Sequence, residues 1–161
     1  MATSQLISQS KRAGLQLTAR NYLGAVVWLA ILALAIYLRF TALDYSLPFV
    51  DGDENPIVEH ALALSLDDLN PHMFYYGSLP FYVFKLVCVG AEGLSRAFVG
   101  PALAFPDYVL VLRYFSALAS MVTIFLVFAF GRLVADSRVG LLSAAIFTLS
   151  PLAIDLAHNA T

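Results

Sequence analysis

Long apolar runs separated by short polar breaks make up most of the sequence. Residues 22–43, 108–131 and 139–157 are each almost free of charged side chains. A transmembrane helix needs about 20 predominantly apolar residues, so each run predicts a helix that crosses a membrane. The pattern therefore predicts an all-α membrane protein with three transmembrane helices.

A fourth apolar segment, residues 79–99, fits this pattern less well. It is rich in aromatic residues, but Lys85, Glu92 and Arg96 interrupt it. A charged side chain at the centre of a bilayer costs at least about 2.5 kcal/mol. We expect an interfacial or re-entrant helix here, and a true span, which would raise the count to four, stays open.

The charges outside the apolar runs predict which way the chain crosses the membrane. Residues 1–21 contain Lys11, Arg12 and Arg20 and no acidic residue, which predicts a cytoplasmic N-terminal tail. The first apolar run is longer than the core of about 7–15 residues in a signal peptide, so we expect a retained helix.

The next polar region, residues 44–107, is expected to form an extracytoplasmic loop that follows the membrane surface. Between residues 44 and 68 there are seven acidic residues and neither Lys nor Arg. Apolar periodicity over residues 56–66 predicts a short amphipathic helix, with Pro56 in its first turn. The loop should therefore be largely helical and juxtamembrane.

Composition agrees with a bilayer as the surrounding medium. The chain is 60% hydrophobic and 12% charged, about half the charged fraction of a soluble domain. The net charge of −2 and the absence of Lys/Arg runs argue against nucleic acid as a partner. Cys88 is the single cysteine, which excludes an intramolecular disulfide and a multi-cysteine metal site.

The candidate chemistry lies in the acidic turn at residues 49–56. Asp51, Asp53 and Glu54 fall within four residues there, and Pro56 follows. Carboxylates at a membrane boundary can act as a general base or bind a hard divalent cation. The alternative is an acidic loop that is merely solvated.

Several short motifs follow one another in an order that resembles a known enzyme group. They are Leu38-Arg39-Phe40, Asp53-Glu54, the proline- and aromatic-rich stretch 69–82, Leu112-Arg113-Tyr114-Phe115-Ser116-Ala117-Leu118, Gly131-Arg132-Leu133 and Leu149-Ser150-Pro151. This order resembles the N-terminal part of integral-membrane C-type-fold glycosyltransferases that use polyprenyl-phosphate sugars. The protein mannosyltransferases and aminoarabinose transferases belong to that group.

The resemblance implies a catalytic role for the Asp-Glu pair of the turn. Asp53 matches the catalytic base, which deprotonates the acceptor hydroxyl as it attacks the anomeric carbon, with inversion of configuration. Glu54 stands beside it as a second catalytic candidate, and Asp51 is a candidate for substrate binding. No cofactor is implied with certainty, and a divalent cation is possible.

The leaving lipid phosphate should be stabilised by a nearby cation. Arg113 matches the arginine at the helix start of the family, and Lys85 and Arg96 are further candidates. His72 is a candidate for hydrogen bonding to substrate. Arg113 as an interface anchor and His72 as an organiser of its own turn are the alternatives.

The function implied is a fragment of a glycosyltransferase in the plasma or inner membrane. Its partners would be the lipid bilayer, a polyprenyl-phosphate sugar donor and a protein or glycolipid acceptor. The second hypothesis is a non-catalytic small membrane subunit of a larger complex, built on a truncated form of this fold. A transporter or channel fragment ranks third, because the acidic cluster lies in a loop and not within the spans.

Overall fold

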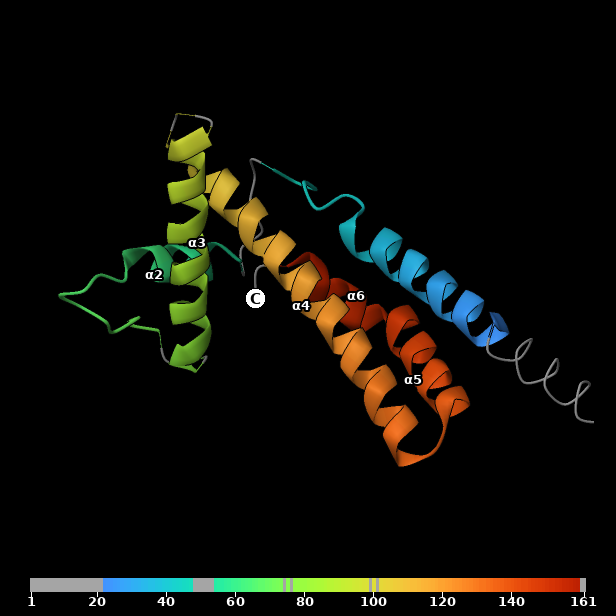
Figure 1. The fold of residues 1–161 in the computed structure, drawn as a ribbon. Helices are drawn as coiled ribbons and strands as arrows, with labels where there is room; N and C mark the ends of the chain where they lie inside the picture. Colours follow the sequence, from blue (N-terminus) through green and yellow to red (C-terminus); the bar gives the residue numbers. More distant parts are fainter. Residues whose placement is uncertain are drawn as a thin grey trace, which may run out of the picture. The chain divides into compact units, whose positions relative to one another are not determined.

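The structure, a computed structural model, describes residues 22–47, 54–73, 75, 77–98, 100 and 102–159. Within these residues all regular structure is helical, which confirms the predicted all-α class. The predicted tail at residues 1–21 lies outside the described residues. The helices in Figure 1 are Tyr22–Phe40, α2 (Glu54–Ala63), α3 (Ser78–Phe98), α4 (Phe105–Val134), α5 (Ser137–Leu149) and α6 (Pro151–His158).

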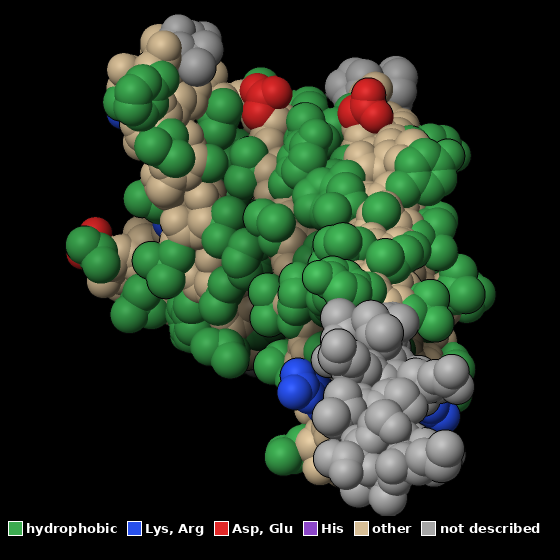
Figure 2. Space-filling model, turned by 45° about the vertical axis from the view of Figure 1, so that its right-hand side comes forward, with side chains coloured by type: hydrophobic (Ala, Val, Ile, Leu, Met, Phe, Trp, Pro, Cys, Tyr) green, Lys and Arg blue, Asp and Glu red, His purple; other side chains and the backbone are tan. Residues whose placement is uncertain are grey.

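Two of these helices, Tyr22–Phe40 and α4, are long and apolar enough to cross a membrane. A third crossing results if α5 and α6 together count as one broken span. Only 17% of the most apolar stretch of each long helix is buried within the protein. Figure 2 shows hydrophobic side chains along the visible helices. Exposed apolar surface on this scale indicates a membrane protein.

The sequence predicted one span over residues 139–157, and the structure divides this segment at a proline. α5 ends at Leu149, Ser150 is extended (φ −65°, ψ 118°), and Pro151 begins α6. A residue before proline avoids the helical region for steric reasons. Proline itself suits the first helical position, where its missing N–H is not required. The count of three or four spans stays a prediction.

The described chain forms two compact units, and the first contains residues 22–36 and 123–149. Trp28 stacks on Phe128 with ring centroids 4.3 Å apart, and it meets Phe125 edge-on at 5.4 Å. In the hairpin between α4 and α5, the two helix backbones approach each other closely at two glycines, Gly131 and Gly140. A Cβ atom added to Gly131 would lie 2.9 Å from the Cα atom of Gly140. Small residues of this kind allow helix backbones to approach closely in membranes.

The second unit contains residues 37–122 and 150–159, and it holds the main hydrophobic core. α2 crosses α3 and packs against it (Figure 1). Apolar residues spaced three or four apart place one face of each helix in this core. The buried members are Ile57, Val58, Ala61 and Leu64 in and just after α2, Phe81, Phe84 and Cys88 in α3, and Val109 and Leu112 in α4.

Candidate functional site

A buried ion pair between Glu54 and Arg113 lies at the start of α2. The Nε of Arg113 donates to Glu54 Oε1 at 3.0 Å, and Nη2 donates to Oε2 at 2.5 Å. Glu54 is 1% exposed and Arg113 is 3% exposed. A carboxylate in the first turn of a helix is favourable, and the planar guanidinium matches its two oxygens. The pair therefore fixes the first residue of α2 against α4.

The same guanidinium also binds the turn that follows the first helix, residues 41–47. Nη1 of Arg113 donates to the carbonyl oxygens of Leu43 (2.9 Å) and Tyr45 (2.7 Å). Within this turn Ala42 (φ 61°) and Ser46 (φ 65°) adopt the left-handed backbone conformation, which residues other than glycine rarely adopt. One arginine thus holds two separate segments of the chain.

His158, the last residue of α6, contacts the same turn. Its Nε2 lies 3.0 Å from the carbonyl oxygen of Thr41, and its Nδ1 lies 2.8 Å from that of Ile154. Carbonyl oxygens only accept hydrogen bonds, and a neutral imidazole donates only one. Both contacts are hydrogen bonds only when the ring carries two protons.

Lys85, predicted as a cation for the leaving phosphate, lies at the other end of α2. Its Nζ donates to the carbonyl oxygen of Leu62 at 2.7 Å. Carbonyls in the last turn of a helix lack partners within the helix, and a cation there is favourable. The two candidate cations, Arg113 and Lys85, therefore hold the two ends of α2.

His72, a candidate for substrate binding, is engaged within its own loop. Its Nε2 lies 2.9 Å from Asp68 Oδ2, and its backbone N–H donates to Asn70 Oδ1 at 3.0 Å. The hydrogen bond with His72, and then that from the Asn70 N–H, hold the pKa of Asp68 below its usual value. This arrangement matches the alternative in which His72 orders its turn.

Glu92 links α3 to α4, a connection that sequence analysis missed. The hydroxyl of Tyr108 donates to Glu92 Oε2 at 2.8 Å, and Arg96 donates to Oε1 at 2.5 Å. The hydrogen bonds from Tyr108 and then Arg96 lower the pKa of Glu92. The spacing of four between Glu92 and Arg96 was the available sequence signal.

A second buried arginine, Arg39, lies near the end of the first helix. It is fully buried, and its Nε donates to Ser120 Oγ at 2.7 Å. Sequence analysis noted this residue only as part of a motif. Its position as the only charge in the first apolar run was the signal that could have marked it.

The remaining candidates, Asp51 and Asp53, lie outside the described residues, and their roles stay predictions. Among the residues that are described, no group of three His, Cys, Asp or Glu side chains could hold a metal ion. The possible divalent cation also stays a prediction.

The structure brings together two of the predicted site residues, Glu54 and Arg113, and pairs Lys85 and His72 with other groups. No family model matches the sequence, and no curated protein or solved structure matches it either. The resemblance to glycosyltransferases therefore rests on the short motifs alone.

Proposed function

We propose that this chain is part of a membrane glycosyltransferase that moves a sugar from a polyprenyl-phosphate carrier to an extracytoplasmic acceptor. The observation that supports this most is the buried pair between Glu54 and Arg113. It anchors the residue next to Asp53, the proposed base, at the start of a packed helix. A base acts efficiently only when its position relative to the reacting hydroxyl is fixed.

In this proposal each polar residue has a distinct task. Asp53 accepts the proton of the acceptor hydroxyl while the oxygen of that hydroxyl forms a bond to the anomeric carbon. The bond from that carbon to the phosphate oxygen breaks, and the lipid phosphate leaves with the electron pair. Glu54 and Arg113 act as positioning residues, because their charged groups are occupied by each other and by backbone carbonyls.

The proposal is tested by sugar transfer in membranes that carry the protein encoded by its full reading frame. The donors are radiolabelled polyprenyl-phosphate mannose and polyprenyl-phosphate aminoarabinose. Asp53→Asn should lower the transfer rate by at least about 100-fold, the usual contribution of a general base. Asp67→Asn removes an exposed carboxylate from the same acidic region and should leave the rate unchanged. Undiminished transfer by Asp53→Asn would exclude Asp53 as the base.

One observation favours the second hypothesis, a non-catalytic membrane subunit. The charged groups of Glu54, Arg113 and Lys85 all bind partners within the chain, as they would in a scaffold. A subunit would co-purify with a larger membrane complex whose activity is insensitive to Asp53→Asn. Loss of transfer in that variant, with the complex intact, would decide for the enzyme.

A further inference from the structure

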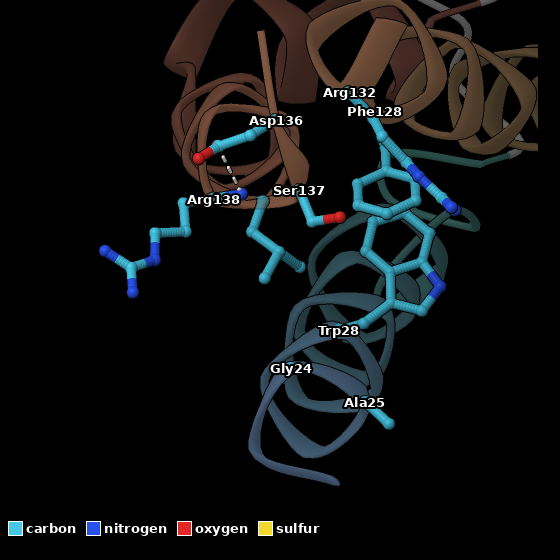
Figure 3. A pocket seen from close by; sticks show the side chains of 9 residues that line it. Gly24, Ala25, Trp28, Phe128, Arg132, Asp136, Ser137 and Arg138 are labelled. Carbon is cyan, nitrogen blue, oxygen red and sulfur yellow. Dashed lines mark hydrogen bonds between the residues drawn. The ribbon is translucent and has the colours of Figure 1, made fainter. Parts of the chain in front are cut away.

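A pocket of about 750 Å³ lies in the first unit, between the start of the Tyr22–Phe40 helix and the α4–α5 hairpin. Figure 3 shows its lining side chains. Gly24 and Trp28 come from the first helix, and Phe128 and Arg132 come from the last turns of α4. The pocket therefore lies where two long apolar helices meet a polar loop.

The pocket has one apolar wall. Trp28 and Phe128, stacked at 4.3 Å, form this wall. A Cβ atom added to Gly24 would meet nothing within 4 Å, so the glycine leaves space beside the tryptophan. This wall can accommodate a hydrocarbon chain.

The rim of the pocket is cationic. Neither the guanidinium of Arg132 nor that of Arg138 forms a hydrogen bond or ion pair with any residue that the structure describes. Figure 3 shows the two side chains on either side of the Ser137 hydroxyl. The carboxylate of Asp136 accepts hydrogen bonds from the N–H groups of Arg138 (2.8 Å) and Val139 (2.9 Å), which caps α5. The rim thus carries two positive charges and one negative charge, and the negatively charged carboxylate already accepts two backbone hydrogen bonds.

We propose that this pocket binds the phosphate headgroup of an anionic membrane lipid, with an acyl chain along Trp28 and Phe128. The guanidinium group matches phosphate geometry, and basic pockets between membrane helices bind lipid headgroups in this way. The alternative is that Arg132 and Arg138 serve only to orient the helices in the membrane. That role would not require a cavity beside the two side chains. The combination of an apolar wall with two arginines whose guanidinium groups bind none of the described residues favours the lipid. The site is independent of the proposed sugar transfer.

Trp28 is the only tryptophan in the chain, so its fluorescence reports directly on the pocket. The purified protein is placed in phosphatidylcholine nanodiscs that contain a minor fraction of phosphatidylglycerol. Either lipid can carry bromine on its acyl chains, which quenches nearby tryptophan. We expect brominated phosphatidylglycerol to quench several-fold more than brominated phosphatidylcholine at equal mole fraction.

The preference for phosphatidylglycerol should fall about fivefold in Arg132→Gln and again in Arg138→Gln, the usual effect of one cation at an anionic membrane surface. The matched control is Arg96→Gln on α3, which removes an exposed arginine elsewhere and should keep the preference. Far-UV circular dichroism checks that each variant keeps its helices. Equal quenching by both lipids, or an equal loss in all three variants, would overturn the proposal. So would a preference abolished by millimolar inorganic phosphate, which would assign the site to a soluble anion.

Discussion

Arg113 binds Glu54, 59 positions earlier in the chain, through two hydrogen bonds that join each carboxylate oxygen to a different guanidinium nitrogen. The third nitrogen of the guanidinium binds the carbonyls of Leu43 and Tyr45. One side chain of α4 thus positions both the start of α2 and the turn after the first helix.

Removing one partner of this pair should strongly destabilise the protein. Glu54→Gln leaves the buried Arg113 charge without its counter-ion, which costs about 3–5 kcal/mol. The free energy of unfolding is measured by reversible titration with dodecyl sulfate in mixed micelles. Glu59→Gln makes the same substitution at an exposed position of α2 and should change stability by less than about 0.5 kcal/mol. Equal stabilities of the two variants would contradict the structural role of the pair.

The α4–α5 hairpin should not tolerate a methyl group at its closest point. A Cβ atom on Gly140 would lie 2.7 Å from the carbonyl oxygen of Phe128, a backbone atom. Gly140→Ala should therefore destabilise the protein by about 1–3 kcal/mol. Gly93→Ala, in open space on α3, should instead stabilise its helix by up to about 1 kcal/mol. Stability changes of the same sign in the same titration would refute the close approach.

The thiol of Cys88 should be nearly inert at neutral pH. Burial in the core of α2, α3 and α4 raises its pKa to about 11. At pH 8 only about one thiol in a thousand is the reactive thiolate. Labelling by N-ethylmaleimide should be at least about 100-fold slower than for Ser78→Cys in a Cys88→Ala background, because Ser78 is exposed at the start of the same helix. Comparable labelling rates would show that the core is open at this point.

Acid should release the loop that His72 and Asp68 organise. The pKa of Asp68 is lowered from 3.8, so its contribution to stability is complete above that value and is lost as the pH falls through the lowered pKa. Carbon-13 NMR of the Asp68 carboxyl group should give a midpoint below 3.8. In His72→Ala the midpoint should rise, while the remaining bond from Asn70 keeps part of the shift. An unchanged midpoint in His72→Ala would remove the histidine as its cause.

The positions of the helices were largely predictable because apolar runs and periodicity are local properties of the sequence. Residues 79–99 were expected to be helical and α3 is Ser78–Phe98; the run at residues 108–131 became the longer α4, Phe105–Val134. Helix ends depend on details such as the Asp107 carboxylate, which accepts a hydrogen bond from the Ala104 N–H before α4. The pattern of apolar residues does not predict hydrogen bonds of this kind.

The partners of the charged residues were much less predictable. Sequence analysis selected Glu54 because it lies in an acidic cluster of an otherwise apolar chain. It selected Arg113 through the resemblance to the glycosyltransferases, with Lys85 as a further cation. It predicted that the cations stabilise a substrate phosphate, and this role stays a prediction. It did not predict the partners that the structure shows, which are a carboxylate and backbone carbonyls for Arg113 and a backbone carbonyl for Lys85. Pairing across tens of residues depends on how the helices pack, and no local pattern carries that information.

The turn at residues 41–47 also has a consequence for the order in which the protein is assembled. The carbonyl oxygens of Leu43 and Tyr45 bind Arg113, so they lack this partner until Arg113 has been synthesised. The carbonyl oxygen of Thr41 contacts His158, which is synthesised 117 positions later. During translation the first helix therefore leaves the ribosome well before the turn at residues 41–47 can form its hydrogen bonds with Arg113 and His158. This early turn therefore gains all of these contacts only after residue 158 has been synthesised.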